Sequence, residues 1–115
     1  MRVLVCGGRD YADKGYVYQA LDRVWREAPM DTMIVIQGGA KGADALAREW
    51  CMERSVEYIN VPANWDAHGR AAGPLRNEKM LRKYVPELVL AFPGGRGTED
   101  MIKRAEKAGV PLQRL

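Results

Sequence analysis

The feature that most constrains how this chain can fold is a repeated order of short apolar run, glycine-rich turn and amphipathic helical stretch. The apolar runs at residues 2–6, 33–37 and 87–92 end at Gly-Gly, Gly-Gly and Pro-Gly-Gly, respectively. After each turn, apolar residues recur three or four positions apart, which is the spacing of one helix face. Strands that alternate with helices in this way favour a parallel sheet, because parallel neighbours need a long crossover connection.

Two further runs bring the expected elements to five strands with four helices between them. Residues 56–61 form the third strand, and residues 110–114 form a last strand that Pro111 confines to an edge, since proline donates no ladder hydrogen bond. Residues 62–74 show no clear period and are expected to be irregular, and Gly109 fits the left-handed position beyond the last helix. The helical stripes comprise Val17, Ala20, Leu21, Val24 and Ala28; Ala43, Leu46, Ala47 and Trp50; Asn77, Met80, Leu81 and Tyr84; and Met101, Ile102, Ala105 and Ala108. We therefore predict an α/β fold, an open parallel sheet of about five strands with helices on both faces.

Composition narrows the class of protein. The 115 residues suit one domain, and 47% of them are hydrophobic, which is enough for an ordinary core. The 18 basic and 15 acidic residues leave a net charge of +3, which suits an anionic ligand but lacks the concentrated basic face of most nucleic-acid binders. Cys6 and Cys51 are expected to be small core residues rather than disulfide partners or metal ligands. No signal peptide or membrane-spanning run is found, so we expect a cytoplasmic protein.

The three glycine-rich turns are candidates for a ligand site. In an open parallel sheet, the turns that follow the strands meet at the carboxyl edge, where ligands bind. Glycine lets the backbone approach a ligand closely, and the helix that follows offers free N–H groups to an anion. A single turn of this kind can serve packing alone, but three together favour a site for a phosphate-bearing ligand. The candidate binding residues here are Gly7, Gly8, Arg9, Asp10, Gly38, Gly39, Ala40, Gly42, Asp44, Pro93, Gly94, Gly95, Gly97 and Thr98.

Two familiar nucleotide-binding patterns are absent from these turns. The chain contains neither GxxxxGK[ST] nor GxGxxG, which disfavours ATP hydrolysis of the P-loop type and ordinary NAD-dependent hydride transfer. His68 is the only histidine, so no histidine-based catalytic set can use more than this one residue. We expect no cofactor and no bound metal.

The charged side chains near the turns are of both signs. The basic ones, which can contact a phosphate, are Arg9, Lys41 and Arg96. The acidic ones repel a phosphate, so they need another task, such as accepting a hydrogen bond from a ribose hydroxyl, polarising a water or pairing with an arginine. Acids in the first turn of a helix can also simply complement its dipole, and Thr98 can act as the N-cap of the last helix. The acids in question are Asp10, Asp44, Glu99 and Asp100.

The segment before the third predicted helix supplies further candidates. Trp65 can stack on a base or can close the core below a long loop, and the sequence leaves both interpretations open. Arg76 begins the following helix near the turn after the fourth strand, where an arginine next to Asn77 is suited to clamp a phosphate or carboxylate. Arg70 completes this set of candidate ligand-binding residues.

Four stretches resemble the YspA-type, cpYpsA-related branch of the SLOG superfamily: GGRDY (7–11), QGGAKGAD (37–44), PANWDAHGRAAGPLRNEKML (62–81) and LAFPGGRGTEDM (90–101). The resemblance covers essentially the whole chain. It implies a single Rossmann-like domain over residues 1–115, a nucleotide-related ligand, a bacterial or phage source and self-association into a homo-oligomer. The superfamily includes the Lonely guy phosphoribohydrolases, which cut nucleoside monophosphates at the N-glycosidic bond, and the DprA-type binders of single-strand DNA.

The phosphoribohydrolase motifs carry over only in part. The RKxxM and PGGxGTxxE patterns are similar to residues 76–80 and 93–101, but Met101 stands where the final glutamate is expected. Methionine cannot transfer a proton, and Asp100 is one position earlier, about 100° around a helix. The leading hypothesis is therefore a sensor or binding domain for a nucleotide-derived small molecule. The second is a hydrolase of an N-glycosidic or phosphoester bond, and the third is single-strand DNA binding. If the chain is an enzyme, its candidate catalytic residues are Arg76, Glu99, Asp100 and Asp44.

Overall fold

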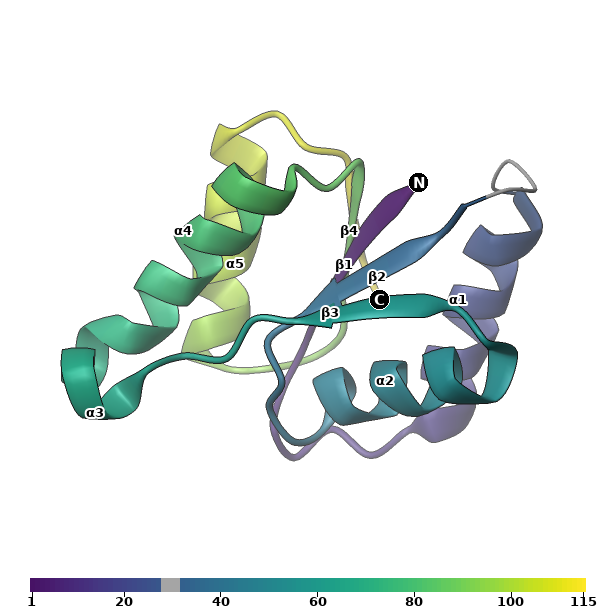
Figure 1. The fold of residues 1–115 in the computed structure, drawn as a ribbon, viewed down its shortest axis with the longest axis horizontal. Helices are drawn as coiled ribbons and strands as arrows, with labels where there is room; N and C mark the ends of the chain where they lie inside the picture. The colour runs from purple at the N-terminus through teal and green to yellow at the C-terminus, as the bar shows by residue number, and fades with distance from the viewer. Residues whose placement is uncertain (28–31) are drawn as a thin grey trace.

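A parallel sheet of five strands, in the order β3-β2-β1-β4-β5, organises the computed structural model, which describes residues 1–27 and 32–115 (Figure 1). Every neighbouring pair of strands is parallel. The strands are β1 (Arg2–Cys6), β2 (Ile34–Gln37), β3 (Glu57–Asn60), β4 (Leu88–Ala91) and β5 (Leu112–Arg114). The helices are α1 (Lys14–Glu27), α2 (Ala43–Arg54), α3 (Trp65–His68), α4 (Ala72–Tyr84) and α5 (Arg96–Lys107), with a short 3₁₀ turn η1 (Gly69–Ala71) between α3 and α4. The predicted α/β class and parallel sheet are confirmed.

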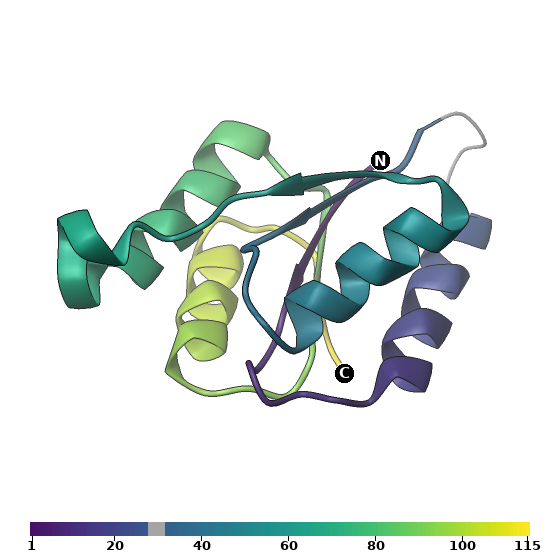
Figure 2. The ribbon, with the colours of Figure 1, turned by 60° about the horizontal axis from the view of Figure 1, so that its bottom comes forward.

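Helices cover both faces of the sheet, with α1 and α2 on one side and α4 and α5 on the other (Figure 2). The central strand β1 shows why. Val3 and Val5 pack into the cluster that includes the apolar stripes of α1 and α2, whereas Leu4 and Cys6 pack into the cluster under α4 and α5. Alternate side chains of a strand point to opposite faces, so a continuous apolar run supplies both layers. None of the helices in the described residues has the length and apolar composition that a bilayer crossing requires.

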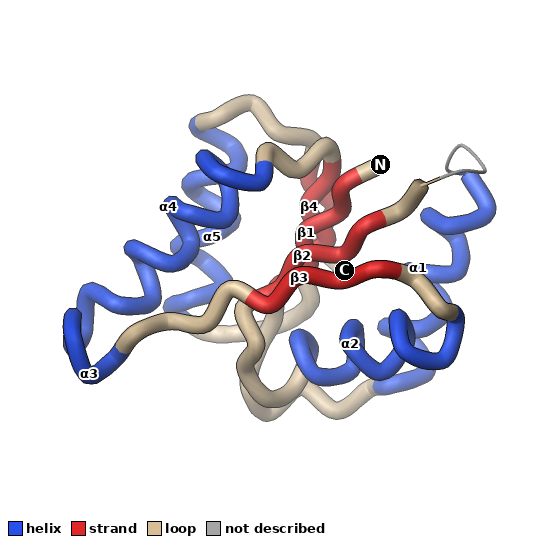
Figure 3. Tube along the Cα trace, viewed as in Figure 1, coloured by secondary structure: helices blue, strands red, loops and turns tan. Residues whose placement is uncertain are grey.

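The strand order fixes where the carboxyl edge opens. The chain moves outward from β1 to β3, then returns to place β4 on the other side of β1. The connections therefore diverge between β1 and β4, and a sheet of this kind leaves a crevice at such a switch point. The turns that follow β1, β2 and β4 gather at this edge (Figure 3).

Most predicted element positions hold, including the edge position of β5, which begins directly after Pro111. Gly109 follows the end of α5 with φ +72°, as expected. The prediction that residues 62–74 are irregular is wrong, because they hold α3, η1 and the start of α4. The side chain of Asn64 accepts a hydrogen bond from the N–H of Ala67 and caps α3, but a helix this short displays no hydrophobic period.

Two smaller expectations need correction or fall outside the description. Thr98 is not the N-cap of α5, because the helix begins at Arg96 and Gly95 occupies the cap. The N–H of Glu99 bonds to the carbonyl of Gly95 at 3.0 Å, which places Thr98 inside the first turn. Ala28, assigned to the first helical stripe, lies outside the described residues.

The turns at the carboxyl edge pack directly on one another. The N–H of Gly8 donates to the carbonyl of Pro93 at 2.9 Å, and the carbonyl of Gly8 accepts from the N–H of Ala43 at 3.2 Å. A Cβ on Gly42 would lie 2.1 Å from the oxygen of Gly8, and one on Gly94 would lie 2.6 Å from its nitrogen. These glycines are required because the turns touch, and the contact fixes the starting points of α2 and α5.

This packing predicts a larger loss of stability for Gly42→Ala than for Gly109→Ala. Both glycines have a positive φ, +73° and +72°, which strains an alanine by about 1–3 kcal/mol at either site. Only Gly42 also faces backbone atoms, so its substitution is expected to cost about 1–3 kcal/mol more. Urea unfolding of the two variants measures the difference. Equal free energies of unfolding would show that contact between the turns adds nothing.

Candidate ligand-binding cavity

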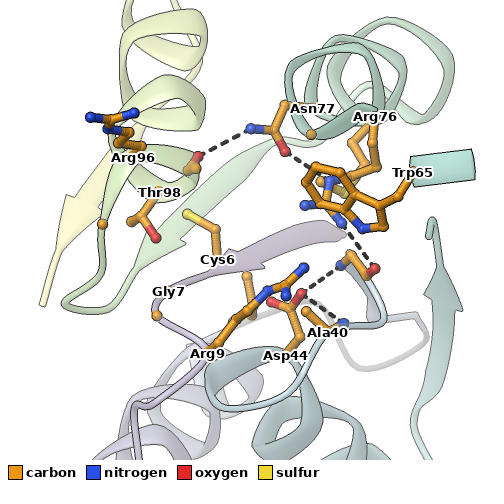
Figure 4. A pocket seen from close by; sticks show the side chains of 17 residues that line it. Cys6, Gly7, Arg9, Ala40, Asp44, Trp65, Arg76, Asn77, Arg96 and Thr98 are labelled. Carbon is orange, nitrogen blue, oxygen red and sulfur yellow. Dashed lines mark hydrogen bonds between the residues drawn. The ribbon is translucent and has the colours of Figure 1, made fainter. Parts of the chain in front are cut away.

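A cavity of about 530 Å³ lies at the carboxyl edge, where the turns after β1, β2 and β4 meet α3 and α4 (Figure 4). Small-molecule sites in proteins have volumes of roughly 300–1,000 Å³, so this one has an ordinary size. It is lined by Val5, Cys6, Gly7, Gly8, Arg9, Gly38, Ala40, Asp44, Trp65, Gly73, Arg76, Asn77, Met80, Gly95, Arg96, Gly97 and Thr98.

Arg76, on α4, is held in the cavity wall by two of its three guanidinium nitrogens. Its Nε donates to Oδ1 of Asn77 at 3.0 Å, and its Nη1 donates to the carbonyl of Gly38 at 2.9 Å. Gly38 must lack a side chain here, because a Cβ would lie 2.1 Å from Nη1. Burial lowers the pKa of the Arg76 guanidinium from its usual value, and the nearby Asp44 carboxylate opposes that shift. Within the described residues Nη2 has no hydrogen-bond partner, so it is free to bind a ligand.

Asp44 lies in the first turn of α2 and is only 6% exposed. Its Oδ2 accepts from the N–H groups of Gly38 at 3.1 Å and Ala40 at 3.3 Å. Burial raises the pKa of the Asp44 carboxyl, and the two backbone hydrogen bonds and Arg76 reduce the shift without reversing it. Among the described residues Oδ1 accepts no hydrogen bond, which leaves it as an acceptor on the cavity side.

The N-terminus of α5 forms another wall. Gly95 caps the helix without any side-chain hydrogen bond. The first hydrogen bond within the helix is donated by the N–H of Glu99 to the carbonyl of Gly95. The N–H groups of Arg96, Gly97 and Thr98 therefore stay unpaired within the helix, at the positive end of its dipole. A Cβ on Gly95 or Gly97 would meet no atom within 4 Å. Unlike the glycines packed between turns, these two border open space.

The side chains of the lining carry more positive than negative charge. The lining contains three arginines, Arg9, Arg76 and Arg96, and a single carboxylate, that of Asp44. This excess favours an anionic ligand, because opposite charges attract more strongly in a partly enclosed site than in bulk water. In the part of the chain that the structure describes, no three His, Cys, Asp or Glu side chains are grouped as metal ligands would be.

Twelve of the predicted binding residues line this cavity, and six do not. Gly42 and Gly94 lie behind the wall, in the contact between turns, while Asp10, Gly39 and Arg70 are away from the lining. Pro93 and Gly94 line a smaller cavity of about 200 Å³ beside β5. The twelve in the lining are Gly7, Gly8, Arg9, Gly38, Ala40, Asp44, Trp65, Arg76, Asn77, Gly95, Gly97 and Thr98.

The four candidate catalytic residues are separated by the structure into two groups. Arg76 and Asp44 share the larger cavity. Glu99 instead pairs with Arg114 at 2.8 Å and lines the smaller cavity, and Asp100 pairs with Arg104 at 2.9 Å. Neither Glu99 nor Asp100 lines the larger cavity, although Oδ2 of Asp100 also accepts from Nδ2 of the lining residue Asn77 at 3.0 Å.

Sequence reasoning missed Val5, Cys6, Gly73 and Met80 as lining residues. Cys6 was expected only in the core, and it is indeed buried, with its thiol pKa raised to about 12 chiefly by burial. It is also the last residue of β1, directly before the turn at Gly7, and this position at the end of a central strand is the signal that places it on the cavity floor.

The raised pKa of Asp44 predicts how stability changes with pH. The folded protein binds the proton of the Asp44 carboxyl more tightly than the unfolded chain does. The stability that this proton contributes is therefore present below the ordinary pKa of 3.8 and is lost as pH rises through the raised pKa. Asp44→Asn keeps an acceptor for both N–H groups but does not titrate. We expect the variant to gain stability relative to the wild type over that pH range, and then a constant difference.

Urea unfolding at a series of pH values measures this effect, because the difference between the two proteins isolates residue 44 from all other titrations. If the wild type instead becomes more stable relative to the variant as pH rises, the surroundings favour the charged carboxylate of Asp44 over the neutral acid.

The fold is similar to that of two solved structures. DNA processing protein A (DprA) from Streptococcus pneumoniae superposes with a TM-score of 0.78 and 17% identity, over 98% of this chain and 49% of that one. The present chain thus spans about half the length of DprA. The protein TM1055 superposes with a TM-score of 0.71 and 17% identity, over 96% of this chain and 71% of its own. At these identities the likeness shows a shared Rossmann-like fold.

Sequence comparison gives the family. The gene 61 protein of Mycobacterium phage D29 is 39% identical over 118 aligned residues, which cover 96% of this chain and 93% of the phage protein. The model of the YspA, cpYpsA-related SLOG family matches residues 1–68, which include β1, β2 and the turns that follow them. This chain therefore belongs to the YspA, cpYpsA-related SLOG family.

Proposed function

We propose that this protein binds a phosphate-bearing, nucleotide-derived small molecule in the larger cavity, as a sensor or ligand-binding domain. The observation that carries the proposal is the presence of Arg9, Arg76 and Arg96 in the lining of one cavity that also contains the uncapped N-terminus of α5. Guanidinium groups and free backbone N–H groups are the two kinds of donor that proteins most often use for phosphate. Membership of a SLOG family supports the same class of ligand.

The phosphate is proposed to bind at the first turn of α5. Here the N–H groups of Arg96, Gly97 and Thr98 are unpaired, and the space that side chains at Gly95 and Gly97 would fill is open. A phosphate at this position gains from the helix dipole and from the Arg96 side chain together.

The sugar is proposed to bind at Asp44. Its Oδ1 is an acceptor on the cavity side, and a ribose hydroxyl is a donor that a carboxylate recognises without needing a second charge. The free Nη2 of Arg76 lies in the same wall and can contact either the hydroxyls or the phosphate. One acid among several arginines suits a ligand that carries both a phosphate and hydroxyl groups.

Arg96→Ala tests the phosphate site without disturbing packing, because this side chain is exposed. A hydrogen bond to a charged group contributes about 1.5–3 kcal/mol, so affinity for nucleoside monophosphates should fall about 10- to 100-fold. Lys103→Ala, an exposed cation farther along α5, is the matched control and should bind as the wild type does. Titration calorimetry at low and at physiological salt measures both variants. Unchanged affinity in Arg96→Ala would place the phosphate elsewhere.

A second candidate function is hydrolysis of an N-glycosidic or phosphoester bond in the same ligand. It is favoured by one observation, the presence of Asp44 and Arg76 in one cavity with the pKa of the acid raised by burial. A carboxyl group in this state can serve as a general acid, which typically contributes about 10²–10⁴ in rate. Chromatography of nucleotides incubated with the wild type and with Asp44→Asn tests this. Turnover that survives Asp44→Asn would remove Asp44 from the chemistry.

Nucleic-acid binding is the third candidate, and it rests on the fold shared with DNA processing protein A. It predicts binding of a labelled single-strand oligonucleotide that weakens steeply with salt, which fluorescence anisotropy detects. A flat titration at low salt excludes it.

Self-association and a cytoplasmic location stay predictions from the sequence. Sedimentation velocity tests self-association.

A further inference from the structure

Trp65 stands on the cavity wall in a way that core packing does not explain. Its side chain lines the cavity, is 48% exposed and belongs to neither of the two hydrophobic clusters under the sheet. It is carried by α3, which together with η1 lies at the far end of α4, away from the sheet (Figures 1 and 2). The short helix thus brings a large aromatic ring to the cavity and leaves much of it uncovered.

Local contacts hold the ring in this position. The side chain of Asn64 caps α3 at the residue before Trp65. Gly73, buried at the start of α4, packs beside the indole, where an added Cβ would lie 3.4 Å from the ring, at ordinary van der Waals distance. The indole therefore has defined support on the α4 side while its remaining surface faces the cavity (Figure 4).

Arg9 contacts the face of this half-exposed ring. The guanidinium carbon of Arg9 lies 5.5 Å from the ring centroid, a cation–π contact between the turn after β1 and α3. Arg9 is exposed and, among the described residues, forms no other hydrogen bond or ion pair. A cation–π contact at an exposed site is typically weaker than the stacking of a nucleobase on an aromatic side chain. A ligand with a planar ring can therefore displace Arg9 from Trp65.

We propose that Trp65 stacks on the nucleobase of the ligand and that Arg9 occupies this surface only while the cavity is empty. The inference rests on the proposed function and narrows its ligand class to nucleotides that retain their base, as opposed to free sugar phosphates. Trp65 lies on the opposite side of the cavity from Thr98 and Arg96, so a base on the indole leaves the α5 end for the phosphate (Figure 4). Arg9, once released, is a third guanidinium for the anionic groups of the same ligand.

The test compares ribose 5-phosphate with the common ribonucleoside 5′-monophosphates, by calorimetry, on the wild type and on Trp65→Ala and Trp65→Phe. Loss of a stacking surface should weaken nucleotide binding in Trp65→Ala about 5- to 100-fold. Binding of ribose 5-phosphate should change little, because it has no ring to stack. Trp65→Phe should recover much of the lost affinity. Trp25→Phe, a second half-exposed tryptophan on α1, is the matched control and should bind as the wild type does.

Tryptophan fluorescence supplies an independent readout. Nucleotide should quench the emission of the wild type and of Trp25→Phe but not that of Trp65→Phe. If Trp65→Ala keeps full nucleotide affinity, this inference fails while phosphate binding at α5 stands. If the wild type binds neither ribose 5-phosphate nor any nucleotide, the proposed function fails with it. Quenching by an oligonucleotide but by no mononucleotide would overturn the proposal in favour of a strand-binding surface.

Discussion

The contact among the turns at the carboxyl edge is the constraint on which the rest of this structure depends. The peptide groups on both sides of Gly8 bond to the turn after β4 and to the start of α2, so one residue ties three segments together. Because the backbone of Gly42 and Gly94 comes within van der Waals distance of Gly8, no side chain fits at either position. This contact sets the distance between the first turns of α2 and α5, and hence the width of the cavity that those turns enclose.

Glycines with the same appearance in the sequence therefore have different physical roles. A side chain at Gly42 or Gly94 would clash with the backbone of another turn, and a side chain at Gly38 would clash with Arg76. Gly95 and Gly97 border empty space at the helix N-terminus. The sequence predicted that all of these positions lie at one edge, since strand order and helix spacing determine it. The sequence could not tell which of these glycines serve packing and which leave space for a ligand. That distinction depends on which atoms the fold brings within a few ångströms of each glycine.

The same dependence on which atoms the fold brings together explains why some predicted charged residues line the larger cavity and others do not. Arg76 was predicted to lie in the site because a helix was expected to begin there, near the turn after β4. The helix α4 in fact begins at Ala72, and Arg76 in its second turn reaches the turn after β2. Glu99 and Asp100 were equally good candidates by position, but β5 and the next turn of α5 supply arginines that pair with them, and neither carboxylate lines the larger cavity. Which arginine pairs with each carboxylate depends on the direction in which the side chain leaves the helix, and a shift of one residue turns that direction by about 100°. The short α3 was missed because four residues carry no period, although it delivers the most exposed aromatic ring of the site.

Gly38 has a further consequence for the electrostatics of the cavity. Its N–H donates to Asp44 and its carbonyl accepts from Arg76, so a neutral residue stands between a full negative and a full positive charge. Within the described residues the two side chains form no direct ion pair, although each shifts the pKa of the other through space. The cavity wall thus presents a donor and an acceptor side by side, held at nearly fixed separation by a single residue. If the proposed function holds, such a surface suits a ligand that offers an acceptor and a donor at matching separation, as a phosphate and a ribose hydroxyl of one molecule do.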